Sequence, residues 1–167
     1  MAEIVTTTYL EMSAPAEIKP RTSPDSRLVI RETVGRQWQL NRFLYTLVGE
    51  PWRWTDRLSW SAAQWQSYVH DDALRTFVAC VEGSISGYYE LHRDEARAVE
   101  IAYFGLAPDF IGRGLGGAFL TDALQRAWAW NARWVWVHTC TRDHPAALKN
   151  YEARGMTIYD RQSRAVA

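Results

Sequence analysis

Apolar residues recur at two different spacings along the chain, and the two spacings separate predicted strands from predicted helices. Alternating or continuous apolar runs predict strands at residues 6–12, 28–33, 74–81, 85–92, 97–106, 134–139 and 156–161. Apolar residues three and four positions apart predict helices at residues 37–48, 61–70, 114–130 and 145–154. Strands alternate with helices and also follow one another directly, so we expect an α/β fold with a mixed, mostly antiparallel sheet and helices on both faces.

The first 26 residues differ from the rest of the chain. Residues 13–26 contain Pro15, Pro20 and Pro24, which interrupt regular structure. We therefore expect residues 1–26 to form an N-terminal strand and a proline-containing loop. The whole chain of 167 residues is the usual length of one globular domain, which buries about 70% of the surface of its unfolded chain, so we predict a single domain over residues 1–167.

Charge and cysteine content exclude several classes of function. The chain has 19 Lys and Arg against 19 Asp and Glu, and its isoelectric point is about 6.9, which argues against a nucleic-acid partner. Cys80 and Cys140 form no disulfide framework and fit a reducing compartment. We see neither a signal-peptide pattern nor a long apolar run, so we expect a soluble cytoplasmic protein without a membrane partner.

A glycine-rich segment carries the strongest functional signal. Residues 110–117 read Phe-Ile-Gly-Arg-Gly-Leu-Gly-Gly and lie between a predicted strand and the longest predicted helix. The first N–H groups of a helix lack internal partners, and glycine lets phosphate oxygens approach the backbone. Arg113 can add a charged contact. We therefore predict phosphate binding here, with a glycine-rich turn that only serves packing as the alternative.

The same glycines also match the spacing of dinucleotide-binding folds, through Gly112, Gly114 and Gly117. Such folds place an acidic residue about 20 positions further on to bind a ribose hydroxyl. Residues 136–139 read Trp-Val-His-Thr and contain no carboxylate. No Gly-Lys-Ser/Thr follows the glycines, which argues against a nucleoside triphosphate loop.

Three segments together resemble the GNAT superfamily of acyl-CoA-dependent N-acyltransferases. They are residues 99–108 (VEIAYFGLAP), the glycine loop, and residues 147–156 (ALKNYEARGM), and the resemblance extends from about residue 28 to residue 159. It implies a GNAT-like fold and acetyl-CoA as the co-substrate. In this family the loop binds the CoA pyrophosphate and the end of the preceding strand pairs with pantetheine. Ile111 departs from the Gln or Arg of the family pattern and has no side-chain donor.

The resemblance therefore implies a set of cofactor-binding residues. His144 belongs to it because it stands where the family usually has Asn, although it can instead cap the helix ahead of Pro145. The predicted set is Phe104, Gly105, Leu106, Ile111, Gly112, Arg113, Gly114, Leu115, Gly116, Gly117 and His144.

Acetyl transfer to an amine needs a base and an acid, because an ammonium with a pKa of about 10.4 must lose a proton and the thiolate must gain one. Glu100 is the candidate base. Strict alternation would place it on the same face as Ala102 and Phe104, and the family often has a catalytic Glu here. The family pattern makes Tyr151 the general acid. The alternatives are a strand carboxylate paired with Arg and a tyrosine that only fills the core.

The acceptor side is predicted from aromatic residues. Trp52 and Trp54 lie in a tryptophan-rich segment that can bind a cationic amine through cation–π attraction, or can pack between helices or at a dimer seam. Glu90 and His92 share one strand face and can reach the acceptor. We therefore predict a small-molecule amine, or the amino group of a metabolite or peptide, as the substrate.

No metal is expected, because His138, Cys140 and His144 match no zinc spacing. Our preferred interpretation is an N-acetyltransferase that transfers acetyl from acetyl-CoA to a primary amine by direct attack in a ternary complex. A non-catalytic acyl-CoA-binding sensor is the alternative from another class. An exposed sheet edge would also allow a homodimer.

Overall fold

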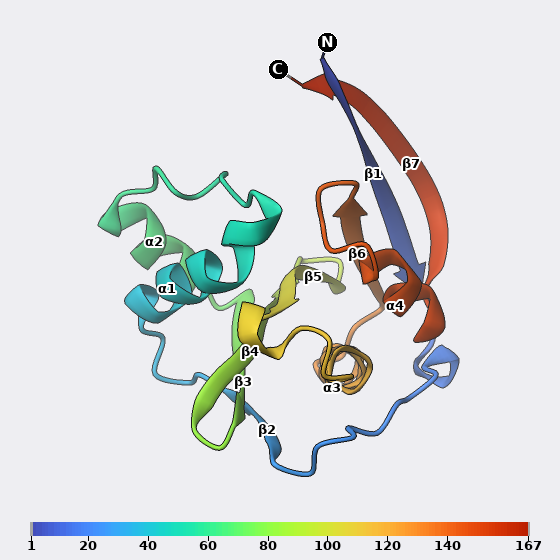
Figure 1. Cartoon of the computed structure of the whole chain (residues 1–167), viewed down its shortest axis with the longest axis horizontal. Helices are drawn as coiled ribbons and strands as arrows, with labels where there is room; N and C mark the ends of the chain where they lie inside the picture. Colours follow the sequence, from blue (N-terminus) through green and yellow to red (C-terminus); the bar gives the residue numbers. More distant parts are fainter. Residues whose placement is uncertain (1, 167) are drawn as a thin grey trace.

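A computed structural model describes residues 2–166, and within them seven strands form one sheet in the order β2-β3-β4-β5-β6-β1-β7 (Figure 1). The strands are β1 (Glu3–Met12), β2 (Leu28–Glu32), β3 (Leu74–Val81), β4 (Ser84–Arg93), β5 (Ala98–Leu106), β6 (Trp134–Cys140) and β7 (Thr157–Val166). The helices are α1 (Trp38–Gly49), α2 (Ala62–Val69), α3 (Gly116–Ala129) and α4 (Ala147–Ala153). The β5–β6 pair is parallel and the other pairs are antiparallel, so the predicted fold class is confirmed.

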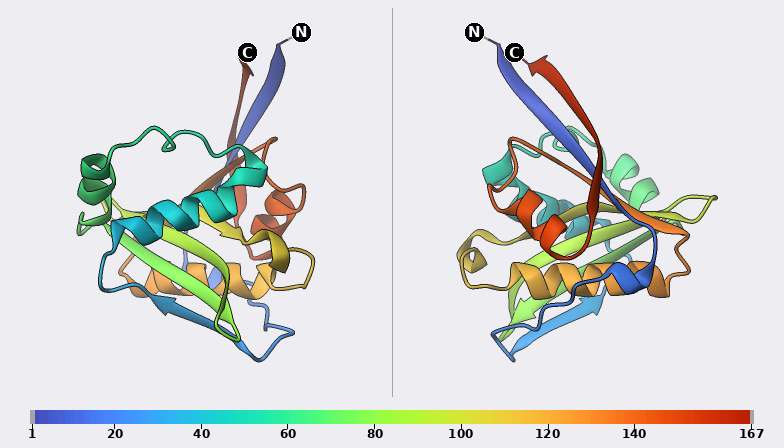
Figure 2. Two further views of the ribbon diagram at one scale, coloured as in Figure 1. Left: turned by 60° about the vertical axis from the view of Figure 1, so that its left-hand side comes forward. Right: turned by 90° about the vertical axis from the view of Figure 1, so that its right-hand side faces the viewer.

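The sheet lies between α1 and α3 (Figure 2). The apolar stripe of α3 packs on the sheet and fully buries Phe119, Leu120 and Leu124. Each such side chain contributes about 1.5–3 kcal/mol by leaving water. On the opposite face, α1 packs Leu44 and Val48 against the strands. The predicted placement of helices on both faces is therefore correct.

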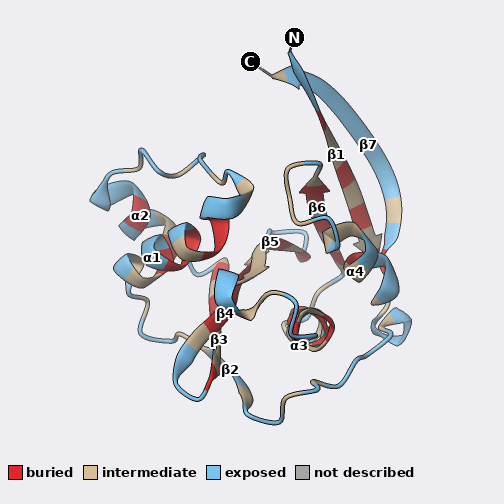
Figure 3. Ribbon diagram, in the orientation of Figure 1, coloured by how far each residue is buried: buried red, intermediate tan, exposed pale blue. Residues whose placement is uncertain are grey.

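Strand β1 has a place in the sheet that the sequence pattern did not predict. It lies between β6 and β7 and pairs antiparallel with both of them. Its side chains Leu10 and Met12 are fully buried, whereas most of β7 is exposed at the edge of the sheet (Figure 3). Strand β1 thus lies inside the sheet and contributes to the core, and β7 extends to residue 166, five residues beyond the predicted end.

A bulge in β5 corrects the predicted alternation. Tyr103 pairs with Glu90 and Ile101 pairs with Leu91, which leaves Ala102 as an extra residue in β5. After the bulge, Phe104 faces α3 and stacks on Phe119 with ring centroids 4.9 Å apart.

The two faces of β5 therefore hold different residues from those expected. Tyr103 packs against Tyr45 of α1, with ring centroids 5.3 Å apart. Glu100 lies on this face with Tyr103 and not on the face of Phe104, so the placement expected from strict alternation was wrong.

Strands β5 and β6 pair only at their beginnings. The parallel register joins Ala98–Glu100 to Trp134–Trp136 and ends there. Beyond Glu100 the two strands separate, so the β6-facing backbone edge of residues 101–106 pairs with no strand in residues 2–166. The separation opens a gap in the middle of the sheet, which is where the candidate site lies.

The proline-containing loop after β1 crosses the ends of α3 and α4. The Lys19 N–H donates to the Arg154 carbonyl at 3.0 Å, and the Arg21 N–H donates to the Thr121 hydroxyl at 3.0 Å. Gly155 follows α4 with a φ of 104°, and a Cβ there would overlap the carbonyl oxygen of Glu17. Close contact between the loop and α4 therefore requires glycine at this position.

We expect Gly155→Ala to lower the free energy of unfolding by about 3 kcal/mol, because backbone strain adds to displacement of the Glu17 carbonyl. Gly83→Ala is the matched control, since Gly83 has a φ of 82° but open space around it. It should cost only about 1 kcal/mol. Urea denaturation measures both variants, and equal losses would contradict close packing of the loop on α4.

Candidate active site

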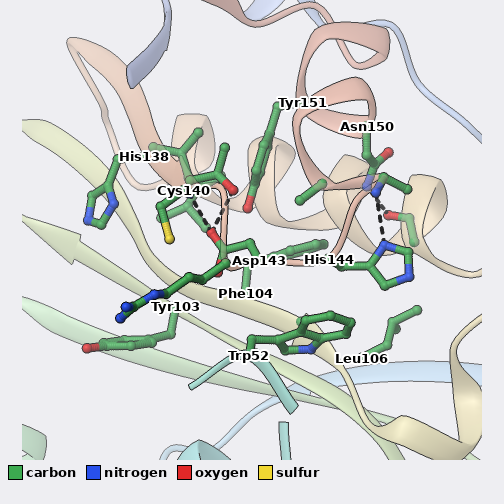
Figure 4. Close-up of a pocket in the computed structure, with 18 of the residues that line it drawn as sticks. Trp52, Tyr103, Phe104, Leu106, His138, Cys140, Asp143, His144, Asn150 and Tyr151 are labelled. Carbon is green, nitrogen blue, oxygen red and sulfur yellow. Dashed lines mark hydrogen bonds between the residues drawn. The ribbon is translucent and has the colours of Figure 1, made fainter. Parts of the chain in front are cut away.

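A cavity of about 700 Å³ occupies the gap between the separated ends of β5 and β6. It extends from the glycine loop at the start of α3 to the segment that follows α1. Figure 4 shows His138, Cys140 and Tyr103 at one end and His144, Asn150 and Leu106 at the other. Two very different chemical environments therefore share one continuous space.

The first end of the cavity, near His144 and Asn150, is formed by the glycine loop. Gly112 and Gly114 adopt φ values of 81° and 76°, which turn the backbone into the start of α3. Asn150 of α4 donates its side-chain amide to the Gly116 carbonyl at 3.0 Å and ties the two helices together. Ile111 and Leu115 also line the cavity. The unpaired N–H groups of a helix start thus meet the cavity, as an anion site requires.

Cationic side chains surround the same loop. Arg21 and Arg154 line the cavity and pack against Gly117. The Nε atom of Arg154 is buried and has no hydrogen-bond partner in residues 2–166. Arg113, in contrast, stacks over the Phe110 ring at 4.6 Å and does not line the cavity. The positive charge at this end therefore comes from different arginines than the predicted one.

The middle of the cavity is lined by apolar and aromatic side chains. Phe104, Gly105 and Leu106 of β5 form one wall, and Tyr151 of α4 faces them. The Tyr151 side chain is buried, with its ring centroid 6.1 Å from that of Phe104. Burial raises the pKa of its hydroxyl, so the group keeps its proton at neutral pH.

The turn after β6 is held by one carboxylate. Asp143 accepts hydrogen bonds from the Thr139 hydroxyl at 2.6 Å and from the Cys140 N–H at 2.8 Å. Burial raises the pKa of the Cys140 thiol, which argues against an acyl-carrying thiolate. Cys140 therefore acts as a small lining residue.

The second end of the cavity is lined by a histidine that has a carboxylate close to it. His138 of β6 lines the cavity, and its Nε2 lies 3.9 Å from Oε1 of Glu100. Burial raises the pKa of Glu100 and lowers that of His138. Asp56 also lines this end and forms no ion pair in the part of the chain that the structure describes. The end therefore combines a neutral imidazole with a free carboxylate.

Side-chain contacts join the opposite walls of the cavity at His144 and at its outer mouth. The Trp52 ring, from the turn after α1, meets the His144 ring edge-on with centroids 5.1 Å apart. His144 also accepts a hydrogen bond from the Ala146 N–H through Nδ1 at 3.0 Å. At the outer mouth, Glu3 of β1 contacts Arg142 at 2.7 Å and Arg53 at 3.5 Å. These contacts limit access of water to the middle of the cavity.

Comparison with known proteins agrees with this geometry. The sequence model of the Acetyltransferase (GNAT) family matches residues 38–156, which is well over half of the chain. The chain belongs to the GNAT family of acetyltransferases. The earlier resemblance is thereby confirmed, and acetyl transfer follows as the general activity of the family.

Named relatives of this GNAT chain are themselves described only in general terms. Uncharacterized N-acetyltransferases of Mycobacterium tuberculosis and Mycobacterium bovis are 32% identical over 98 residues. The match covers 59% of this chain and 62% of each relative. It thus spans about three fifths of the relatives' own length.

Solved structures support the GNAT fold. A GCN5-related N-acetyltransferase from Sphaerobacter thermophilus superposes with a TM-score of 0.69 at 14% identity, covering 97% of this chain and 52% of that one. An aminoglycoside acetyltransferase from a soil metagenomic sample gives 0.64 at 17% identity, covering 78% and 88%. At such identities the likeness shows the fold alone.

The predicted acceptor residues divide into two groups in this GNAT structure. Trp52 and Trp54 line the cavity, whereas Glu90 and His92 do not. Glu90 is fully buried and accepts hydrogen bonds from the Asn41 amide at 2.9 Å and the Tyr68 hydroxyl at 2.7 Å. Glu90 and His92, predicted as residues that can reach toward the acceptor, therefore lie outside the cavity lining.

Glu90 instead binds an arginine of the GNAT chain itself. Arg57 lies 3.5 Å from the Glu90 carboxylate, and its guanidinium sits 3.8 Å from the Tyr68 ring, 4.6 Å from Trp60 and 4.4 Å from Tyr103. Only 12% of the Arg57 side chain is exposed. This cluster fixes the segment between α1 and α2, part of which lines the cavity.

Sequence reasoning missed several residues that line the cavity. His138 was considered only as a metal ligand, and Asp56, Arg21 and Arg154 were not singled out. The alternation of β6 puts His138 on the face of Trp136. The sequence pattern does not show, however, that β5 and β6 stop pairing before His138. Arg21 lies in the proline-containing loop, whose position could not be predicted from local sequence.

Residues 2–166 contain no group of three or more His, Cys, Asp or Glu side chains placed to hold a metal ion. In the same residues, no helix is both long enough and apolar enough to span a membrane.

We expect Arg57→Ala to lower the free energy of unfolding by about 3 kcal/mol, because it leaves the buried Glu90 carboxylate without its cation. Arg57→Lys keeps the charge but loses the planar stack on Tyr68, so its loss should be smaller. Urea denaturation measures both. If Arg57→Ala unfolds with the wild-type midpoint, the cluster does not stabilise this segment.

Proposed function

We propose that this protein transfers the acetyl group of acetyl-CoA to the primary amine of a small molecule by direct attack in a ternary complex. The observation that carries the proposal is one continuous cavity that joins a helix-start anion site to His138, which lies 3.9 Å from the Glu100 carboxylate. The amine and the thioester would then meet in the middle of the cavity, beside Tyr151.

Coenzyme A fits the first end by charge and by shape. Its diphosphate would accept hydrogen bonds from backbone N–H groups of Gly114 to Gly117, with Arg21 and Arg154 beside it. Its pantetheine amides would pair with the free backbone edge of Phe104 to Leu106, as an added strand does. When bound, acetyl-CoA supplies the activated acyl group.

The two proton transfers are assigned to residues at opposite sides of the middle. Glu100 takes the proton that the amine loses, since burial has raised its pKa toward that of a useful base. Tyr151 gives a proton to the departing thiolate, since it stays protonated at neutral pH. Neither step requires a metal ligand.

The acceptor is a cationic amine of modest size. Trp54 and Asp56 both line the cavity, and an aromatic ring and a carboxylate both favour an ammonium group. Arg53 and Arg142 are held by Glu3 and leave the Asp56 charge free.

We expect coenzyme A to raise the melting temperature, because a ligand at 100 times its Kd stabilises the folded state by about 2.7 kcal/mol. Pantetheine lacks the diphosphate, so it should give little or no shift at the same concentration. NAD, which carries a diphosphate without a pantetheine arm, is the second control. A shift with NAD that equals the shift with coenzyme A would contradict the proposed cofactor.

In a second test, Tyr151→Phe and Glu100→Gln should each lower kcat about 100-fold, while the shift with coenzyme A stays near that of the wild type. Thiol release from acetyl-CoA with a panel of ethanolamine, putrescine, tyramine and lysine measures turnover. A wild-type protein that binds acetyl-CoA but acetylates no amine would favour the acyl-CoA sensor instead.

A further inference from the structure

Glu100 does not itself reach the cavity. It sits at the last parallel pair of β5 and β6, opposite Trp136, and is not among the lining residues. Its side chain is 24% exposed, against 47% for His138. An amine that enters the cavity would therefore meet the His138 ring before it meets the Glu100 carboxylate.

The strand geometry explains this order. On β6, Trp136 and His138 lie on one face because successive side chains alternate, and Val137 points into the core. β5 has already separated from β6 at this level, so on its β5 side the His138 ring projects over the gap. Figure 4 shows it at the same end of the cavity as Tyr103 and Cys140.

We propose that His138 is the catalytic base that contacts the acceptor amine, and that Glu100 acts through it as the positioning carboxylate and final proton acceptor. This inference rests on the proposed function and specifies its base. The Nε2 to Oε1 distance of 3.9 Å is longer than a hydrogen bond, and a small side-chain rotation or one bridging water closes it.

The surroundings of the ring suit this role. Tyr9 of β1 packs against His138 with ring centroids 5.7 Å apart, and Trp136 lies 6.3 Å away. Asp56 and Asp143 favour the charged imidazole, but burial outweighs them and lowers its pKa. Arg57 favours the charged form of Glu100, yet burial raises that pKa. The two pKa values therefore move toward each other, which eases transfer of a proton between the groups.

The step balances in atoms and charge. The ammonium gives one proton to Nε2 of His138, and the freed nitrogen lone pair attacks the thioester carbonyl. The new N–C bond forms as the C–S bond breaks, and the thiolate takes a proton from Tyr151. The nitrogen gives up its second proton as the amide forms, and this proton restores the Tyr151 hydroxyl. The first proton leaves through His138 and Glu100 to solvent, so both groups end in their starting state.

The kinetic test uses His138→Gln, with acetyl-CoA and the amine of the panel that reacts best. We expect kcat to fall about 100-fold, the KM for acetyl-CoA to stay unchanged, and the acid limb of the kcat–pH profile to disappear. His70→Gln is the control, because His70 contacts the Arg36 carbonyl at the end of α2, does not line the cavity, and should keep wild-type kcat.

A double variant tests whether the two residues act in series. If the proton passes from His138 to Glu100, the variant with both His138→Gln and Glu100→Gln should lose no more activity than the worse single variant. Two independent bases would give losses that multiply. Multiplicative losses would overturn the relay.

Proton NMR titration of His138 supplies a readout without substrate. We expect Glu100→Gln to lower the pKa of His138, because it removes a carboxylate 3.9 Å from the ring. An unchanged pKa, or wild-type kcat in His138→Gln, would overturn this inference while leaving acetyl transfer intact. Absence of turnover by the wild type would instead refute the proposed function itself.

Discussion

The early end of pairing between β5 and β6 is the constraint on which the site depends. Backbone groups at a strand edge need hydrogen-bond partners, and residues 101–106 face a gap in place of a strand. An extended ligand with amide groups can satisfy that edge. The glycine loop follows directly from β5, so the same segment that loses its partner strand also leads into the anion site at the start of α3.

The bulge at Ala102 lets β5 serve both ends of the cavity. Before the bulge, Glu100 lies on the face that α1 covers, and after it Phe104 packs on α3. The glycine-loop end of the cavity is therefore built by α3 and α4, whereas the segment after α1 lines the part proposed for the acceptor. Arg57, held by Glu90 and three aromatic rings, fixes that segment against the sheet.

The fold class, the order of elements and the glycine loop could be predicted because each depends on the spacing of apolar residues and glycines within a short segment. The placement of β1 could not, because it depends on pairing with β6 and β7 more than 100 residues away. The bulge at Ala102 leaves no mark in composition, so Glu100 was assigned to the wrong face. Glu90 was taken for an acceptor contact because nothing local indicates that Arg57 binds it in the core.

A crystal structure with coenzyme A tests the account most directly. We predict the diphosphate at the backbone N–H groups of Gly114 to Gly117, the pantetheine arm along the free edge of Phe104 to Leu106, and the sulfur near the Tyr151 hydroxyl. Coenzyme A bound elsewhere, or a gap between β5 and β6 that closes and excludes it, would contradict the central claim that the separation of these strands forms the acyl-carrier site.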